Sequence, residues 1–291
     1  MKYILRIKSG IRRLGLLGAI KYMAVRFRIR FLRENPLVTY PVTRLIIFLD
    51  RYGSPNFLFR FINIKRDQSA NERMQQLKSL LQHNLTDGAK ILEIGSWFGE
   101  GSTKIILENA PKYSTIFIVD SWKPYTSALD RISRYRWLFN FYKTMDDLTF
   151  SAFHSITNII WDYEKLRPDL KIVLIRADSL NILSVLSEHY FDLIYLDGSH
   201  YYEQISSDIR LAKRLINKEA GIICGDDLEK LPNESDILIC KKNLDRDLIQ
   251  NADNGQFHPG VMLAVSEEFA QVKMASGFWW IFTDDYNSSF K

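Results

Sequence analysis

Two short apolar runs, each ended by acidic residues and separated by a helical pattern, constrain the fold of this chain most. Residues 191–196 (FDLIYL) are almost entirely apolar and stop at Asp197, and residues 221–225 (GIICG) stop at the pair Asp226 and Asp227. Between them, residues 201–215 place apolar side chains mainly three and four positions apart, as an amphipathic helix does. A strand, a helix and a second strand of this kind form a parallel unit buried on both faces. The carboxyl ends of parallel strands meet at one edge of a sheet, where open α/β sheets bind ligands, so we expect the three aspartates there.

Three carboxylates at one edge of a sheet repel one another unless a positive charge neutralises them. A hard divalent cation with oxygen ligands does this most simply, so Asp197, Asp226 and Asp227 predict a Mg²⁺ site. His200, three residues after Asp197, is placed to take a proton from a substrate hydroxyl. Structural interpretations stay open: aspartates at strand ends also act as turn residues and helix caps, and His200 also fits a loop as a hydrogen-bonded structural side chain.

Length and charge divide the chain unevenly. The 291 residues fit one large domain of about 200–250 residues with an appendage, and 46% hydrophobic residues indicate a globular core. Residues 1–33 hold ten Lys or Arg and no acid, so of the net charge of +5 this segment carries +10 and the remainder 5 − 10 = −5. We therefore expect a basic arm with its connector over residues 1–70 and a folded domain over residues 71–291. The two cysteines, Cys224 and Cys240, predict no disulfide framework.

The basic arm alternates apolar and cationic side chains at helical spacing. Such a helix can lie on an anionic membrane surface, which would place the protein in the cytoplasm and in part on the inner face of a membrane. Packing against the domain or in a homo-oligomer explains the same pattern. The longest stretch without charge, residues 14–20, is too short to span a bilayer and does not resemble a signal peptide. No nucleic-acid-binding motif accompanies the charge, so we expect no nucleic-acid partner.

A glycine loop follows the first strand predicted for the domain. Residues 90–94 form this strand, Gly95, Gly99 and Gly101 lie in the loop, and a helix is expected over residues 102–109. The spacing differs from the dinucleotide fingerprint G-x-G-x-x-G, and Glu93 at the strand end suits an ammonium or hydroxyl group better than a pyrophosphate. A second predicted strand ends at Asp120, placed to accept both hydroxyls of a ribose. A third ends at Asp178 and Ser179, where a polar side chain can meet an adenine edge. The pattern therefore favours a nucleoside ligand.

Two insertions and the chain end complete the predicted architecture. Residues 121–169 are rich in aromatic and basic side chains, which fit either helix packing or a lid over a ring-shaped acceptor. Residues 228–257 are polar and form a second candidate substrate loop. Residues 271–275 and 278–283 predict two strands turned at Ser276 and Gly277. We expect an α/β, Rossmann-like, mostly parallel seven-stranded sheet with an antiparallel C-terminal strand pair, plus the basic N-terminal helical arm.

These motifs resemble a known family. LEIGSWFGEGS, IFIVDSW, IRADS, DGSHYYEQISSDI, GIICGDD and HPGVMLAV are similar to class I S-adenosylmethionine-dependent methyltransferases, and within them to metal-dependent O-methyltransferases of the macrocin type and their cephalosporin-hydroxylase-like relatives. The resemblance covers roughly residues 77–282. It implies that Glu93, Gly95 and Gly99 line the methionine part of the cofactor, Asp120 holds its ribose, and Asp178 with Ser179 borders its adenine. The full cofactor-binding set that we carry over is Glu93, Gly95, Ser96, Gly99, Ser102, Asp120, Ser121, Asp178, Ser179 and Asp197.

The resemblance also implies roles on the acceptor side. Asp197, Asp226 and Asp227 match the metal ligands of the family, and His200 stands where catechol O-methyltransferases have a lysine base. Asp197 and His200 are therefore the expected catalytic residues. The expected cofactors are S-adenosylmethionine and Mg²⁺ or another divalent cation.

Three functions from different classes remain open on the sequence. The first is divalent-metal-assisted methylation of a hydroxyl, of a sugar in a glycan or glycosylated metabolite, with an aromatic hydroxyl in the same class. The second is an NAD-dependent oxidoreductase on a Rossmann sheet, which the glycine spacing and the three aspartates disfavour. The third is a non-catalytic, membrane-associated module that keeps the fold for binding.

Overall fold

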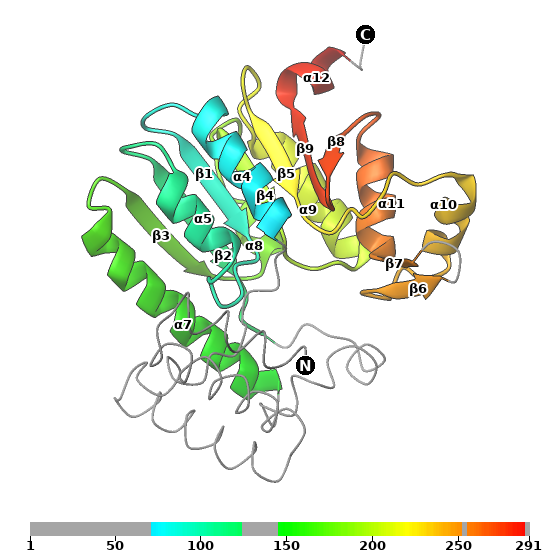
Figure 1. Cartoon of the computed structure of the whole chain (residues 1–291), viewed down its shortest axis with the longest axis horizontal. Helices are drawn as coiled ribbons and strands as arrows, with labels where there is room; N and C mark the ends of the chain where they lie inside the picture. The colour runs from blue at the N-terminus through cyan, green and yellow to red at the C-terminus, as the bar shows by residue number, and fades with distance from the viewer. Residues whose placement is uncertain (1–70, 124–144, 252–254, 289–291) are drawn as a thin grey trace, which may run out of the picture. The chain divides into compact units, whose positions relative to one another are not determined.

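The computed structural model describes residues 71–123, 145–251 and 255–288 (Figure 1). The chain divides into two compact units, one with residues 1–66 and 135–151, and one with residues 67–134 and 152–291. The second unit contains the sheet and every site residue described below. The predicted basic arm and residues 124–144 of the predicted aromatic lid lie outside the described residues, so the interpretations of both stay predictions.

A seven-stranded sheet forms the centre of the second unit. Its strand order is β3-β2-β1-β4-β5-β9-β8. Strands β3, β2, β1, β4 and β5 are parallel to one another, whereas β9 is antiparallel to both β5 and β8. The predicted sheet with an antiparallel C-terminal pair is therefore confirmed. The strands are β1 (Lys90–Ile94), β2 (Thr115–Asp120), β3 (Lys171–Arg176), β4 (Leu193–Leu196), β5 (Ile222–Gly225), β8 (Lys273–Ala275) and β9 (Phe278–Phe282).

Helices cover both faces of this sheet (Figure 1). Helix α4 packs on α5, and the C-terminal part of α7 joins them because Tyr163 donates to Glu108 and Arg167 donates to the carbonyl of Leu107. Helices α8 and α11 pack on α9, and α10 packs on α11. The helices are α4 (Asn71–Asn84), α5 (Ser102–Asn109), α7 (Met145–Leu166), α8 (Ser179–Leu183), α9 (Tyr202–Leu215), α10 (Glu234–Lys241), α11 (Pro259–Glu268) and α12 (Thr283–Ser288).

The apolar periodicity of the sequence explains the core. The side chains of β4 and β5 are all buried, as continuous apolar strands covered on both faces require. Helix α9 buries Ile205, Ile209, Ala212 and Leu215, which lie on one stripe at three- and four-residue spacing. These residues belong to a single core cluster with α11 and the middle of the sheet.

Some predicted strand boundaries differ from the structure. The strand predicted over 191–196 begins at Leu193, and Phe191 makes only an isolated bridge to Ile216. Thr283, predicted to end the last strand, begins α12 instead. Its hydroxyl accepts from the backbone N–H of Gly221, which ties the end of β9 to the start of β5. At the start of β4 the apolar run extends beyond the ladder to Phe191, so periodicity alone predicts too long a strand there.

The polar insertion after β5 has structure of its own. It contains α10, which begins with a capping box between Asn233 and Asp236, and a two-stranded hairpin of β6 (Ile249–Asn251) and β7 (Gly255–Phe257). Within residues 71–123, 145–251 and 255–288, no helix is long and apolar enough to cross a membrane.

Candidate active site

The glycine loop after β1 depends on close backbone contact at Gly95. Gly95 has φ of +85°, in the left-handed region that favours glycine. A Cβ atom here would collide with the backbone carbonyl of Asp197 and with Cα of Gly198. The loop after β1 and the loop after β4 therefore touch through their backbones, and this contact brings the predicted cofactor loop next to the predicted catalytic loop.

Glu93 lies in the protein interior between the glycine loop and α5. Its side chain is completely buried. Its two carboxylate oxygens accept hydrogen bonds from Ser102 Oγ at 2.6 Å and Thr103 Oγ1 at 2.8 Å, both in the first turn of α5. Burial raises the pKa of Glu93 to about 8, although these two hydrogen bonds lower it. Glu93 and Ser102, both predicted to bind cofactor, thus join the end of β1 to the start of α5.

Asp120 holds the glycine loop from the neighbouring strand. Its Oδ2 accepts from the backbone N–H groups of Ser96 at 3.0 Å and Trp97 at 2.9 Å, and its Oδ1 accepts from that of Trp122 at 2.8 Å. Burial raises the pKa of Asp120, against the effect of these bonds. Ser121, the other residue predicted here, lies directly after the strand and accepts weakly from Lys123 N at 3.4 Å.

Ser96 is the residue in this loop whose side chain still requires a partner. Its hydroxyl oxygen is buried, and it has no hydrogen-bond partner among the described residues. A buried hydroxyl of this kind costs free energy unless a ligand or water satisfies it. Ser96 therefore marks the place where a polar ligand group is expected.

Two tryptophans that sequence reasoning did not single out brace the loop. Trp97 and Trp122 both adopt positive φ, of 52° and 42°, which is unusual for bulky side chains and is found preferentially at functional loops. The indole N–H of Trp122 donates to the carbonyl of Trp97 at 2.9 Å, and its ring packs on Phe153 with centroids 5.0 Å apart. The motif signal for them was weak, because each follows a strand end in a sequence with many aromatic residues.

The predicted adenine border lies at the start of α8. Asp178 caps this helix by accepting from Leu180 N at 3.1 Å. Ser179 Oγ accepts from Gln204 Nε2 at 2.9 Å, and Gln204 also lies 3.5 Å from the carboxylate of Asp208. Ser179 is thus connected to α9 through Gln204, which lies next to the buried acid Asp208.

Replacing this buried acid should change how stability depends on pH. Burial raises the pKa of Asp208 to about 7, against the hydrogen bonds from Ser179 and Gln204. The folded state therefore holds this proton more strongly than the unfolded state does. The corresponding stability is fully present below about pH 4 and is lost as the pH rises to about 7, by about 1.4 kcal/mol per pH unit. In urea unfolding between about pH 4 and about pH 8, Asp208→Asn should lose this slope, and an unchanged slope would contradict the assignment.

The loops after β4 and β5 bring the predicted acids and His200 together. His200 Nε2 lies 3.1 Å from Asp227 Oδ2 and 4.0 Å from Asp197 Oδ1. Tyr195, within β4, donates its hydroxyl to Asp197 Oδ2 at 3.1 Å. Because β4 and β5 are adjacent and parallel, both loops emerge at the same edge, as the sequence predicted.

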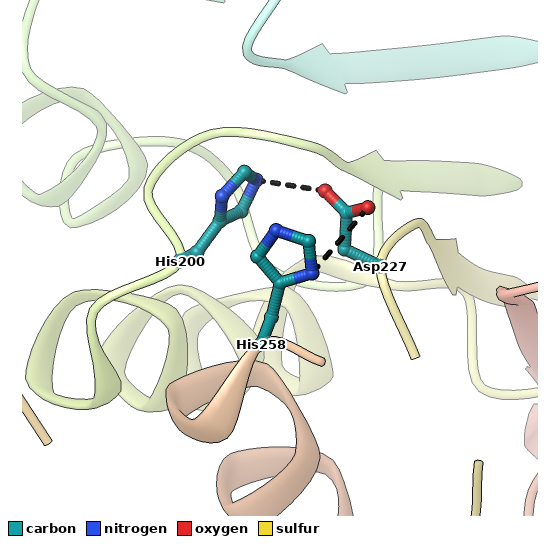
Figure 2. A group of neighbouring side chains, drawn as sticks. All are labelled: His200, Asp227 and His258. Carbon is teal, nitrogen blue, oxygen red and sulfur yellow. Dashed lines mark ion pairs between the residues drawn. The ribbon is translucent and has the colours of Figure 1, made fainter. Parts of the chain in front are cut away.

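His258, which sequence analysis did not select, completes this cluster. It directly precedes α11, and Figure 2 shows its ring beside that of His200, with Asp227 between the two imidazoles and the end of β5. The ring centroids of His200 and His258 lie 4.6 Å apart. His258 Nδ1 lies 3.6 Å from Asp227 Oδ1. His258 begins the HPGVMLAV motif, but no role was predicted for this histidine.

Two further carboxylates hold the imidazoles. Asp247 Oδ1 lies 2.6 Å from His200 Nδ1, and Glu229 Oε1 lies 2.7 Å from His258 Nδ1. Glu229 also accepts from the backbone N–H of His258 at 3.1 Å. Both acids come from the predicted substrate loop 228–257, which therefore contributes to the site through carboxylates that carried no motif.

Arg73 supplies a positive charge from α4. Its Nη1 lies 2.8 Å from Asp226 Oδ1 and 2.7 Å from Asp227 Oδ1, and its Nε donates to the carbonyl of Ser276. Asp226 Oδ1 also accepts from the backbone N–H of Asp227. Asp226 thus faces Arg73, whereas Asp227, with φ of 62°, meets both Arg73 and the two imidazoles.

The charges of this cluster shift its pKa values in opposite directions. Burial and the neighbouring Asp227 raise the pKa of Asp226. Burial alone would raise the pKa of Asp227, but His258, His200 and Arg73 together lower it. Burial opposes protonation of His200, yet Asp227, Asp197 and Asp247 raise its pKa well above the usual value. The cluster therefore favours an ionised Asp227.

Removing the Arg73 charge should destabilise the protein. Arg73→Met leaves Asp226 and Asp227 without their guanidinium partner, and breaking such a partly buried pair should lower the free energy of unfolding by roughly 3 kcal/mol. The matched control is Arg210→Met, because Arg210 is 59% exposed and its pair with Glu268 should contribute less than about 1 kcal/mol. Urea unfolding of both variants tests this, and equal losses would contradict a special role for Arg73.

A candidate metal centre can be defined from the donor atoms. One ligand atom from each of His200, Asp227 and His258 lies within 4.8 Å of the others. Of the three predicted metal ligands, this group includes Asp227 but not Asp197 or Asp226. It adds His200, which was predicted as the base, and His258.

Part of the chain matches a known protein family. Residues 92–228 match a family model described as a methyltransferase domain. No curated protein matches the sequence. Similar solved structures include an O-methyltransferase from Bacillus cereus in complex with SAH, with 15% identity, coverage of 85% of this chain and 98% of that chain, and a TM-score of 0.45. A protein from Corynebacterium glutamicum has 12% identity, coverage of 81% and 88%, and a TM-score of 0.43.

These TM-scores are too low to transfer any chemistry. The assignment therefore rests on the sheet and on the matched segment, which runs from β1 to the loop after β5 and so includes the glycine loop, Asp120, His200 and the acid pair. The strand order with its antiparallel pair is that of a Rossmann-like α/β fold, and residues 92–228 of this fold match the methyltransferase-domain model.

Proposed function

We propose that the protein is an O-methyltransferase that uses S-adenosylmethionine to methylate a hydroxyl group. The single observation that carries the proposal is the backbone contact of Gly95 with Asp197 and Gly198. It places the loop expected to hold the methyl donor directly beside the loop that carries His200. A donor and an acceptor bound to these two loops would meet at one edge of the sheet, as methyl transfer requires.

The residues on the donor side suit a nucleoside with a charged amino-acid tail. The buried, unpartnered hydroxyl of Ser96 supports a polar contact to the tail. Asp120 is proposed to hold the ribose, with Ser121 beside it, and Asp178 with Ser179 to border the adenine. The cofactor would supply an activated methyl group. Glu93 and Ser102 would contribute by fixing the loop.

On the acceptor side, His200 is proposed as the general base. The bond between His200 Nδ1 and Asp247 orients the ring and leaves Nε2 pointing toward Asp227 and Asp197. In its neutral form, which its raised pKa confines to higher pH, His200 Nε2 would take the proton of the acceptor hydroxyl. As that oxygen bonds to the methyl carbon, the bond from this carbon to the sulfonium sulfur would break, and S-adenosylhomocysteine would leave. Asp197, held by Tyr195, would orient the acceptor hydroxyl. The two predicted catalytic residues are thus proposed to act on the acceptor hydroxyl, His200 as its base and Asp197 as the group that orients it.

The predicted Mg²⁺ site on three aspartates fits this arrangement only in part. Arg73 already contacts one oxygen of Asp226 and one of Asp227, so the protein itself supplies the positive charge on which that prediction rested. The Mg²⁺ site on Asp197, Asp226 and Asp227 stays a prediction, and no step proposed here depends on it.

A sugar hydroxyl is the proposed acceptor. Support comes from the resemblance of the DGSHYYEQISSDI and GIICGDD motifs to sugar O-methyltransferases, and from the polar residues that the 228–257 insertion brings to the site. Carboxylates and imidazoles are the groups that bind sugar hydroxyls by hydrogen bonds. An anionic membrane surface as a partner of residues 1–33 stays a prediction, because that segment lies outside the described residues.

Calorimetric titration tests the proposal. Purified protein is titrated with S-adenosylhomocysteine and with NAD, and Ser96→Ala is compared with the unmodified protein. Binding of S-adenosylhomocysteine alone, weakened by about tenfold in Ser96→Ala, is expected, because one hydrogen bond to a charged group contributes about 1.5 kcal/mol. Binding of NAD alone would replace methyl transfer with an oxidoreductase function, and binding of neither would favour a non-catalytic module.

A further inference from the structure

We infer that His200, Asp227 and His258 form a binding site for one transition-metal ion of the Zn²⁺, Co²⁺ or Fe²⁺ class, in preference to Mg²⁺. The site lies on the acceptor side of the proposed active site. Metal binding itself does not depend on the proposed methyl transfer. Only the effect of the metal on turnover rests on that function.

Three separate segments converge on this site (Figure 2). His200 lies in the loop before α9, Asp227 follows β5, and His258 precedes α11. Gly260 makes the approach of the two histidines possible, because a Cβ atom at Gly260 would collide with the backbone of residues 200–202. The start of α11 therefore packs directly on the His200 loop, and the two imidazoles meet for a reason built into the backbone.

The orientation of His200 is that of a metal ligand. Its Nδ1 is held by Asp247, whose side chain is only 5% exposed. Its Nε2 is buried and has no hydrogen-bond partner of acceptable geometry among the described residues, although Asp227 Oδ2 is 3.1 Å away. A metal-bound histidine usually contacts a carboxylate through one ring nitrogen and the metal through the other. The carboxylate fixes the tautomer and makes the metal-binding nitrogen a better electron-pair donor.

His258 also contacts a carboxylate outside the site, through Nδ1, the nitrogen that lies 3.6 Å from Asp227 Oδ1. Its side chain is 3% exposed, and Glu229 contacts both its Nδ1 and its backbone N–H. Two imidazoles, each in contact with an outer carboxylate, thus flank Asp227.

The charge of the cluster also favours a divalent cation. Arg73 offsets part of the charge of Asp226 and Asp227, whereas Glu229 and Asp247 face imidazoles, which carry a charge only when protonated. A divalent ion between His200, Asp227 and His258 would offset the charge of Asp227 and of these outer carboxylates. The donor set decides which ion: imidazole suits Zn²⁺, Fe²⁺ and their neighbours, whereas Mg²⁺ prefers an all-oxygen site.

Coordination has a consequence for the role of His200. A nitrogen that binds a metal has no lone pair left for a proton. Metal binding and the proposed base role of His200 therefore exclude each other, and such an ion would inhibit the proposed methyl transfer.

The experiment compares Co²⁺, Zn²⁺ and Mg²⁺ on the full chain after EDTA treatment and dialysis, by calorimetry and, for Co²⁺, by its visible absorption. We expect one Co²⁺ or Zn²⁺ per chain, bound at least about 100-fold more tightly than Mg²⁺. His258→Gln should abolish this preference, and Asp247→Asn should weaken Co²⁺ binding by about 10- to 100-fold. His83→Gln is the matched control, since His83 lies exposed on α4, remote in sequence from the cluster. Equal affinity for Mg²⁺ and Co²⁺, or unchanged Co²⁺ binding in His258→Gln, would overturn the inference.

A direct readout covers the case in which a variant fails to fold. Electron paramagnetic resonance of Cu²⁺ bound to the unmodified protein should show hyperfine coupling to two imidazole nitrogens, and a spectrum without nitrogen coupling would overturn the site. Titration of S-adenosylhomocysteine into the same EDTA-treated protein keeps the two proposals apart. If S-adenosylhomocysteine binds while Co²⁺ does not, the metal site is wrong and the methyltransferase proposal stands. If Co²⁺ binds while S-adenosylhomocysteine does not, the metal site stands and the methyltransferase proposal is wrong.

Discussion

His200→Ala should lower kcat for methyl transfer by about 100- to 10,000-fold, the range over which a positioned general base contributes to catalysis. The side chain is 17% exposed, and its Nε2 faces Asp227 and Asp197 where the acceptor is expected. Because it lies on the acceptor side, the affinity for S-adenosylhomocysteine should stay within about twofold of the unmodified protein. Turnover is measured by release of S-adenosylhomocysteine in metal-free buffer.

Controls separate catalysis from structure. Asp247→Asn keeps the ring in place but removes the charge that holds it, so kcat should fall while S-adenosylhomocysteine still binds. His83→Ala removes an exposed histidine and should leave both quantities unchanged. If His200→Ala keeps full kcat, His200 is not the base, even if the protein proves to be a methyltransferase.

Gly95→Ala should abolish binding of S-adenosylhomocysteine and lower thermal stability. The residue has φ of +85°, and its Cβ would meet the backbone of Asp197 and Gly198, which has no flexible end that can move aside. The two loops must therefore separate, and the donor and acceptor sides separate with them. Calorimetry with S-adenosylhomocysteine and a thermal melt measure the two effects.

Gly88→Ala is the matched control for the glycine loop. Gly88 has nearly the same backbone conformation, with φ of +84°, but no atom lies within 4 Å of the Cβ position. The Gly88→Ala variant should lose only about 1–2 kcal/mol of stability to backbone strain, and its affinity for S-adenosylhomocysteine should be unchanged. If Gly95→Ala and Gly88→Ala behave alike, the contact between the two loops does not hold the site together.

Local patterns were sufficient to predict the sheet and the positions of its terminal acids. Continuous apolar runs indicated β4 and β5, and the helical stripe between them indicated α9. Since parallel strands all end at one edge, Asp197 and Asp227 had to lie close together once these strands were recognised. The antiparallel pair at the chain end followed in the same way from two short apolar strands around a Ser-Gly turn.

The partners of these acids could not be predicted, because they depend on contacts between distant segments. Arg73 is 154 residues from Asp227 and reaches it only because α4 lies against the turn at Ser276 and Gly277. Asp247 is 47 residues from His200 and belongs to a loop without regularly spaced apolar residues. A lone Arg or Asp in a polar stretch looks the same whether it faces solvent or an active site.

The roles of some residues in the structure differ from their predicted roles for the same reason. Glu93 and Asp120 were expected to face the cofactor, but most of their hydrogen-bonding capacity holds the glycine loop and α5. Sequence position shows that an acid ends a strand. The surrounding donors, which come from other segments, decide whether its oxygens point to a ligand or to the backbone.

The sequence by itself determined the class of sheet, the edge at which ligands bind and the presence of an acidic, histidine-containing loop there, because these follow from periodicity and strand direction. Tertiary structure alone decided that Arg73 faces the acid pair, that His258 joins His200 and Asp227, and that Asp247 and Glu229 hold the two imidazoles. Those contacts depend on how the helices and the 228–257 insertion pack, and packing is a property of the folded chain and not of any local segment.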